Sequence, residues 1–564
     1  MSGQDSGSVS ATLGRVVTVP DGYRRACRLL GLSTPAATVL CASYGLAAAF
    51  WLLGLAAVAA GTGAVAIVGG AGCVVLAVGV AVAGRYGVPL AAQARRIRAL
   101  GAAPALVATL GLGMSLWPSA ERAATFAASA GDGLLASSLD THRRRAARTP
   151  RSGLDAFGRE WGDEFQALAR SLARIERAAA VTPSERTELL GAARRGILEG
   201  TRDEMAAFAA ELRGPATALY AFGVLLPLAL VAMLPAVAAA GLPVSLSLLV
   251  VTYGLALPAG LAVASAWLLA QRPVAFPPAP VPRNHPDVST GPLVAIGTGV
   301  AVGLGGWLVG TAVLPAWAPG IAALGPGVGT ALVVYFRPVT RVRDTVERTE
   351  AGLPDALSAI GRRVERGESV EAAFEAAVDA APEPLSSLLA ETVERQATLG
   401  VDVESAFLGD HGTLSTLPSP RLRRAAVLLG AAADIGPPAG ETIATMGDHL
   451  TELRSVERET RRDLSQVTGT LSNTAAVFGP MVGGATVALS ATMGGGGPIE
   501  SVSTASLGPV VGWYCLTLAA VLTALSTGLH RGLDRALVGY RTGRALCSAT
   551  AVYLVAVVAT GLLV

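Results

Sequence analysis

The side chains most able to do chemistry in this chain are five histidines and five cysteines, and their spacing argues against a metal centre. They are His142, His285, His411, His449, His530, Cys27, Cys41, Cys73, Cys515 and Cys547. Zinc sites usually take two ligands from one short motif, but the chain contains neither HExxH nor CxxC. The tripeptide Gly-Asp-His ends at His411 and again at His449, which we assign to a short loop and a surface helix. We expect no metal, and we expect the cysteines to be small buried side chains.

Lysine is absent, since all 44 basic residues are arginine, and this excludes several kinds of reaction. A P-loop needs a lysine to reach the terminal phosphates of a nucleotide, and Schiff-base catalysis needs a lysine amine. The apolar runs also contain neither GxSxG nor the aspartate pair of a membrane peptidase. We therefore expect a protein that is not an enzyme and has no cofactor. If ATP drives its activity, another protein hydrolyses the ATP.

A helical hairpin with one polar face is predicted at residues 352–377. Its first helix has an apolar stripe at helical spacing, formed by Leu353, Leu357, Ile360 and Val364. Gly367 should end this helix, and Ser369 should cap the next one. The charged residues around the turn are Arg362, Arg363, Glu365, Arg366, Glu368 and Glu371.

The rest of the chain indicates that this hairpin belongs to a membrane protein. Of the 564 residues, 52% are hydrophobic and only 15% are charged. A bilayer core is spanned by about 20 apolar helical residues. Nine runs without a charged residue meet that length, at 36–60, 62–83, 215–240, 243–270, 292–315, 316–336, 471–493, 508–529 and 545–564.

The arginines predict how these nine spans are oriented, because cytoplasmic loops collect basic residues. With the N-terminus inside, the internal segments are 1–35, 84–214, 271–291, 337–470 and 530–544, and together they contain every arginine. Span pairs then occupy 36–83, 215–270, 292–336 and 471–529, with a last span at 545–564. We predict a multi-pass protein of the cell membrane with a cytoplasmic N-terminus and an external C-terminus.

The two long internal segments, 84–214 and 337–470, are predicted to be repeated cytoplasmic helical-bundle domains. A shift of 250 residues aligns Pro104 with Pro354 and Ser119 with Ser369. Their charges differ, since 84–214 carries a net +5 and 337–470 a net −7. The basic domain could lie near anionic lipid headgroups, and the acidic domain could accept a basic partner. Solvated helix faces with an incidental net charge are the alternative interpretation.

An apolar chain with two such repeats, the sequence GLPDALSAIGRRVERGESVEAAFEAAV and a downstream ERQATLGVDVESAF resembles the type II secretion F-domain family. The likeness is to archaeal platform proteins of type IV pili and the archaellum, and it covers about residues 99–529. It implies an all-α polytopic membrane platform that engages a hexameric secretion ATPase and passes pilin-like subunits from the bilayer into a filament. It further implies a homo-oligomer that binds no nucleic acid.

The resemblance also suggests where such a motor would bind. The first repeat reads GLGMSLWPSAE at residues 111–121, whereas the second reads GRRVERGESVE at 361–371. If the contact depends on charge, the second repeat is the better candidate, and its six charged residues between Arg362 and Glu371 form the predicted partner-binding surface.

A membrane transporter or channel made of two fused halves is the alternative function. The Pro-rich segment 271–291 should be an extended linker between two membrane halves, and glycine- and proline-interrupted spans are common in transporters. Against this, transporters usually place ionisable residues within the membrane, and the nine runs contain none that are charged.

Overall fold

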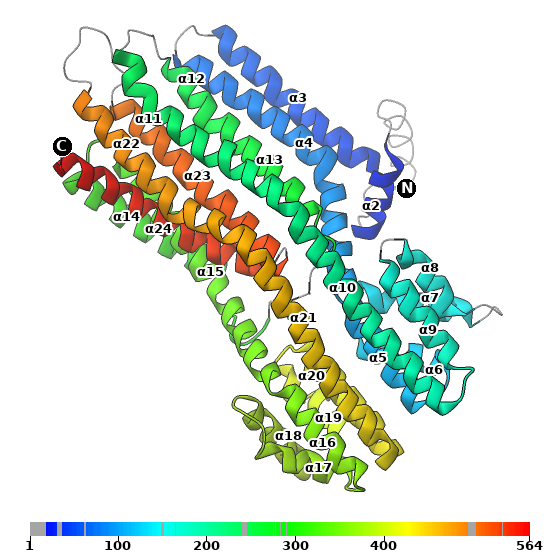
Figure 1. Cartoon of the computed structure of the whole chain (residues 1–564). Coiled ribbons are helices and arrows are strands. Elements are labelled where there is room, and N and C mark those ends of the chain that lie inside the picture. The colour runs from blue at the N-terminus through cyan, green and yellow to red at the C-terminus, as the bar shows by residue number, and fades with distance from the viewer. Residues whose placement is uncertain are drawn as a thin grey trace, which may run out of the picture.

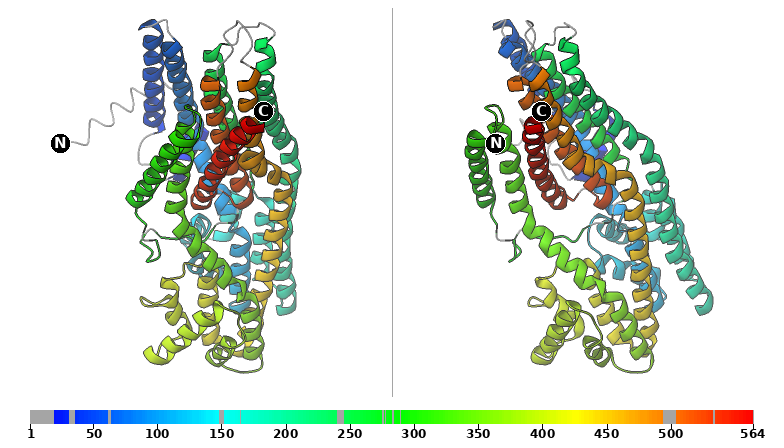
Figure 2. Two further views of the ribbon diagram at one scale, coloured as in Figure 1. Left: turned by 90° about the vertical axis from the view of Figure 1, so that its left-hand side faces the viewer. Right: turned by 60° about the vertical axis from the view of Figure 1, so that its left-hand side comes forward.

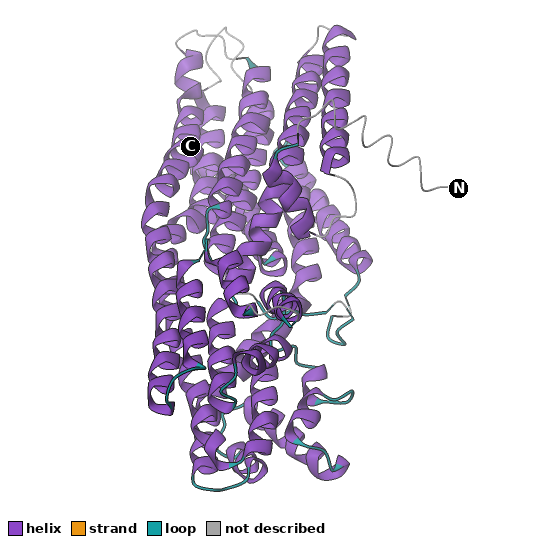
Figure 3. Ribbon diagram, turned by 90° about the vertical axis from the view of Figure 1, so that its right-hand side faces the viewer, coloured by secondary structure: helices purple, strands orange, loops and turns teal. Residues whose placement is uncertain are grey.

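The computed structural model describes residues 19–30, 36–60, 64–147, 152–163, 165–239, 245–274, 276, 278–282, 284–288, 290–493, 504–532 and 534–563. Every regular element among them is helical, as Figure 3 shows. The prediction of an all-α protein is therefore confirmed for this part of the chain.

Within the described residues, eight helical segments are long and apolar enough to cross a membrane, whereas the sequence predicted nine spans. They are Ala36–Ala56, Leu76–Leu116, Pro183–Leu234, Leu246–Ala270, Pro292–Val313, Pro319–Glu365, Ala505–Arg531 and Arg535–Leu563. The predicted run 471–493 is helical but is not among these eight segments. The predicted run 62–83 lies in a helix that begins at Ala64 and continues well beyond it.

The apolar helices gather at one end of an elongated molecule, and two helical bundles lie at the other end (Figure 1). The helices of the apolar end are α2 (Asp21–Leu30), α3 (Ala36–Ala60), α4 (Ala64–Leu100), α11 (Leu226–Ala239), α12 (Leu246–Val251), α13 (Leu257–Ala270), α14 (Pro292–Val313), α15 (Pro319–Ala351), α22 (Gly479–Met493), α23 (Thr504–Arg531) and α24 (Arg535–Leu563). Most of the predicted loop 530–544 is therefore helical, because α24 begins at Arg535.

Close helix packing in the apolar end depends on small residues. A Cβ atom on Gly299 of α14 would come within 2.7 Å of Ala331 in α15, and one on Gly306 would come within 2.3 Å of the Ala322 carbonyl oxygen. On its other side, α15 packs against α24, where a Cβ on Gly329 would meet Cys547 at 2.6 Å. The glycines spaced four apart in α14 therefore pack it against its sequence neighbour, and the pair is visible in Figure 2.

Helices α10 (Pro183–Tyr220) and α21 (Gly440–Asn473) pass from the bundles into the apolar end without a break. Each continues through a π-helical turn, η1 (Ala221–Leu225) or η5 (Thr474–Phe478), into α11 or α22. At 1.5 Å per residue, each continuous helix is roughly 80 Å long. A third π-turn, η2 (Thr252–Ala256), joins α12 to α13. The helix that enters the predicted run 471–493 therefore begins in the second bundle, at Gly440.

The π-turns lie against α23, which supplies donors to the carbonyl groups around them. The Tyr514 hydroxyl donates to the Gly223 carbonyl of η1, and the Trp513 indole donates to the Gly254 carbonyl of η2 at 3.1 Å. A π-turn widens the helix by one residue and leaves carbonyl groups open to such donors. These contacts join apolar helices from both halves of the chain.

The first bundle consists of α5 to α9 and the bundle end of α10. Its shorter helices are α5 (Ala103–Leu116), α6 (Ala120–Ala130), α7 (Leu134–Ala146), α8 (Gly153–Gly162) and α9 (Gln166–Ala178). The core buries Leu110, Phe157, Leu168 and Ile175. Helix α5 packs inside this bundle, which explains why 72% of the apolar stretch of Leu76–Leu116 is buried, against 17% for Ala36–Ala56.

The second bundle consists of α16 to α20 and the bundle end of α21. Its shorter elements are α16 (Leu353–Glu365), α17 (Val370–Val378), α18 (Leu385–Leu399), α19 (Val403–Leu408), the 3₁₀ turns η3 (Thr413–Ser415) and η4 (Pro437–Ala439), and α20 (Pro420–Ile435). The predicted apolar stripe of α16 is buried in its core, as are Val370 and Phe374 of α17. Gly367 adopts φ +97°, and the Ser369 hydroxyl accepts a hydrogen bond from the Ala372 N–H, so the predicted turn and cap are both confirmed.

The two bundles pack against each other through α5, α6, α10, α20 and α21. Leu112 and Phe126 of the first bundle belong to the core of the second, and Trp117 packs edge-on against Phe126 with ring centroids 5.7 Å apart. The Arg202 guanidinium of α10 pairs with Glu459 of α21 at 2.7 Å. The opposite net charges of the two segments are therefore used in part to hold the bundles together.

The Pro-rich segment 271–291 is non-helical where it is described, and it is packed against its neighbours. Val274 is buried, and the buried ring of His285 lies 3.0 Å from the Thr416 carbonyl oxygen in the second bundle. The Arg272 guanidinium donates to the carbonyls of Gly528 and Leu529 at the end of α23. These contacts fix the segment across the junction between the apolar helices and the second bundle.

Candidate functional site: a distal charged turn and an ion-pair junction

The six predicted partner-binding residues lie together at the turn between α16 and α17. This turn is at the end of the second bundle farthest from the apolar helices, because α16 ends beside the start of α21. A Cβ on Gly440 would lie 2.5 Å from the Glu365 backbone nitrogen. The close approach requires glycine at position 440 and fixes the end of α16 on the beginning of the long helix.

Within the distal turn, some charges are paired and others are open. The Glu368 carboxylate accepts from Arg363 at 3.1 Å and lies 3.7 Å from Arg366. Arg362, Glu365 and Glu371 are exposed and form no ion pair within the described part of the chain. Exposed pairs of this kind contribute at most about 1 kcal/mol to stability, so the turn can exchange them for contacts with a partner.

The corresponding turn of the first bundle is used inside the molecule. It joins α5 to α6, and its apolar residues Leu112, Leu116 and Trp117 pack against the second bundle. The difference between GLGMSLWPSAE and GRRVERGESVE therefore has a structural cause, since one turn is covered and the other is exposed.

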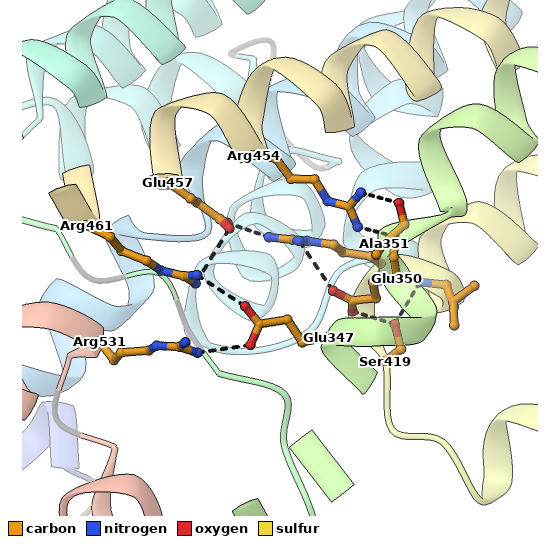
Figure 4. A network of polar contacts seen from close by, with 10 residues as sticks. Glu347, Glu350, Ala351, Ser419, Arg454, Glu457, Arg461 and Arg531 are labelled. Carbon is orange, nitrogen blue, oxygen red and sulfur yellow. Dashed lines mark hydrogen bonds and ion pairs between the residues drawn. The ribbon is translucent and has the colours of Figure 1, made fainter. Parts of the chain in front are cut away.

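A second charged cluster, the ion-pair junction, lies where the second bundle joins the apolar helices (Figure 4). Arg421 of α20 lies between two carboxylates from different helices, Glu350 of α15 at 3.3 Å and Glu457 of α21. Glu350 also accepts from the Ser419 hydroxyl, the N-cap of α20, at 2.6 Å. Burial alone would lower the pKa of Arg421, but Glu457 and Glu350 reverse the effect and raise it.

The ion-pair junction includes a residue of α23, and it caps the C-terminal carbonyl groups of α15. Glu347 is shared by Arg461 of α21 at 3.2 Å and Arg531 of α23 at 3.0 Å. Arg454 donates to the last carbonyls of α15, those of Glu350 and Ala351, which would otherwise be unsatisfied. Three helices of the second half, α15, α21 and α23, are thereby tied to α20.

Sequence reasoning did not identify the ion-pair junction. Its members on one helix have regular spacings, such as Glu457 and Arg461 four residues apart, but such pairs are common on solvated helices. Their pairing with Arg421 depends on how three distant segments pack. The expectation that His449 lies on a surface helix was also wrong, because α10, α16 and α20 surround α21 and leave His449 only 2% exposed.

In the part of the chain that the structure describes, no group of three or more histidine, cysteine or acidic side chains could hold a metal ion. No protein-family model matches the chain, and no curated protein or solved structure matches it either.

Proposed function

We propose that this protein is the membrane platform of a filament-assembly or secretion machine of the type IV pilus and type II secretion kind. A hexameric ATPase acts on its bundles from the cytoplasm, and pilin-like subunits are assembled at its apolar helices. The observation that carries the proposal is the continuity of α10–η1–α11 and α21–η5–α22. A force applied to either bundle would reach the apolar end through an unbroken helix.

We further propose that the two bundles are repeated cytoplasmic domains. The order of elements supports this, since each half has an apolar helix, a long helix entering a bundle, short helices, and a second long helix with a π-turn. Ser119 of α6 and Ser369 of α17, which the 250-residue shift aligns, are both N-caps. The nine predicted apolar runs contain no arginine, which supports a cytoplasmic position for both arginine-containing bundles.

The distal turn is the proposed contact with the ATPase. It is exposed, it lies on the bundle farthest from the apolar end, and α16 packs directly on α21. A partner that pushes on the turn therefore acts on the helix that enters the membrane. The ion-pair junction then ties the movement of α21 to α15 and α23.

Charge reversal at the distal turn tests this contact. The triple variant Arg362→Glu, Arg363→Glu, Arg366→Glu should lose co-purification with a secretion ATPase from the same organism, because exposed interface charges determine partner choice. The matched control reverses Arg143, Arg144 and Arg145 of α7, three arginines of the first bundle, and should leave binding unchanged.

Deletion of the gene should also remove surface filaments. Normal filaments after deletion would refute the platform proposal. Unchanged ATPase binding by the triple variant, with normal filament assembly, would refute the proposed role of the distal turn. A transport defect without loss of filaments would instead favour the two-halved transporter.

A further inference from the structure

A cavity of about 380 Å³ lies beside the ion-pair junction, where the apolar stretches of α13, α15 and α23 end. Its walls come from both halves of the chain, namely the starts of α5 and α7, the Pro-rich segment, α15, α20, α21, and the connection from α23 to α24. Small-molecule sites usually enclose about 300–1,000 Å³. The cavity is therefore large enough for a ligand with a charged headgroup.

Six arginines line this cavity: Arg272, Arg343, Arg421, Arg424, Arg461 and Arg531. Four of the lining carboxylates are engaged by them. Asp534 pairs with Arg343, Glu350 and Glu457 pair with Arg421, and Glu347 is shared by Arg461 and Arg531. The other two lining carboxylates, Asp132 and Asp344, are exposed and form no ion pair in the described structure.

Two of the six arginines have no carboxylate within ion-pair distance. The guanidinium group of Arg272 instead donates hydrogen bonds to the backbone carbonyls of Val274, Gly528 and Leu529. Arg424 has no ion pair or hydrogen bond to the described residues. Arg424 is half-buried, and burial and the neighbouring Arg421 lower its pKa to about 10, while Glu350 and Asp132 act in the opposite direction. A cation in such a position is stabilised by any anion that can reach it.

The backbone adds donors to the wall of the same cavity. Helix α7 begins at the cavity wall after Gly133, and no side chain caps its first N–H groups. Free N–H groups at the start of a helix favour a bound anion. The planar guanidinium group matches the oxygens of a phosphate better than it matches a spherical anion.

We propose that the cavity binds a phosphate group, held by Arg424 and the N-terminus of α7. The phosphate belongs either to a lipid headgroup, since the cavity lies where the apolar helices end, or to a free phosphate compound. The proposal does not depend on the function proposed above. It predicts a ligand-dependent stabilisation of the junction between the second bundle and the apolar helices.

The test measures the thermal unfolding temperature of the full-length protein in nanodiscs. One arm adds inorganic pyrophosphate to nanodiscs of phosphatidylcholine, and the other replaces part of that lipid with phosphatidylglycerol, with no free phosphate. The variants are Arg424→Gln and, as the matched control, Arg423→Gln, its exposed neighbour on α20. Arg424→Lys, which keeps the charge, should retain part of the effect.

We expect the wild type and Arg423→Gln to unfold at a higher temperature in one arm, with an apparent Kd at least about tenfold lower than that of Arg424→Gln. A shift with pyrophosphate identifies a free phosphate compound, and a shift with phosphatidylglycerol alone identifies a lipid headgroup. Without ligand, Arg424→Gln should unfold at or above the wild-type temperature, because a half-buried cation without an ion pair to the described residues is removed. No shift in either arm, or equal shifts for Arg424→Gln and Arg423→Gln, would overturn the proposal.

Discussion

Arg421 is the residue on which the ion-pair junction is centred, since it bridges carboxylates from α15 and α21. Replacing it with methionine would leave Glu350 and Glu457 buried without their cation. Loss of one member of a buried ion pair costs about 3–5 kcal/mol. We therefore expect Arg421→Met to lower the free energy of unfolding by that amount, measured by denaturant unfolding of the purified protein.

Arg423→Met is the matched control for this prediction, because Arg423 is on the same helix and exposed. Its effect should stay within about 0.5 kcal/mol. Equal losses for the two variants would show that the ion-pair junction contributes no more than an ordinary surface charge.

His449 predicts a dependence of stability on pH. Both ring nitrogens lack a partner among the described residues, and burial, with the charges of Arg194, Arg424 and Arg421, lowers the pKa of His449 to about 3. The unfolded chain, with a histidine pKa of about 6.5, takes up the proton first as the pH falls. The contribution of the neutral His449 to the free energy of unfolding is therefore fully present above about pH 6.5, and it is lost progressively as the pH falls from about 6.5 to about 3.

The variant His449→Phe should lose less stability between pH 7 and pH 5 than the wild type, by about 2 kcal/mol. The exposed His411, which ends the other Gly-Asp-His sequence, serves as the control, and His411→Phe should behave as the wild type. Identical pH profiles for all three proteins would contradict the assignment of a neutral buried imidazole.

At this scale, local chemistry was predictable and long-range pairing was not. The positive φ of Gly367 and the cap at Ser369 follow from residue types within a few positions of each other. The burial of His449 and the pairing of Arg421 depend on which helices surround α21. The spacing of residues within one helix does not predict which other helices pack around α21.

Among the elements, α21 is one through which we propose that force is transmitted, because it runs from the second bundle into η5 and α22. Ser465 is exposed on α21 between these two parts. The variant Ser465→Pro removes one backbone hydrogen bond and clashes with the preceding turn, at a cost of about 3 kcal/mol. We expect it to abolish filament assembly while ATPase binding is retained, measured by filament counts and co-purification.

Ser465→Ala is the control for that experiment and should assemble filaments normally. Wild-type filament numbers with Ser465→Pro would show that an unbroken α21 is not required. Loss of ATPase binding as well would point to unfolding of the second bundle, which circular dichroism would reveal.

Element boundaries were predictable where composition changes abruptly. The predicted run 36–60 coincides with α3, and 292–315 nearly coincides with α14. The three π-turns, which contact α23, were not predicted, because they leave the hydrophobic pattern almost unchanged. The helical start of α24 was missed because its arginines resemble those of a loop.

For the whole molecule, the sequence predicts an all-helical chain with many apolar helices, and the structure confirms this with eight candidate spans. The contact between the two bundles was not predicted, although residues 111–117 are largely apolar where the aligned sequence of the second bundle is charged. Trp117 and Leu112 pack against the second bundle, and this contact accounts for the difference. Exposed ion pairs such as Arg202–Glu459 add to that contact, but the net charges of the two segments do not determine its geometry.

The most direct test of the platform proposal is the side of the membrane on which the distal turn lies. In a cysteine-free background, Glu365→Cys should react with a membrane-impermeant maleimide only after the cells are permeabilised. Ala316→Cys, in the exposed connection between α14 and α15 at the opposite end, should react in intact cells. Labelling of Glu365→Cys in intact cells would contradict the account, because no cytoplasmic ATPase could then reach the turn.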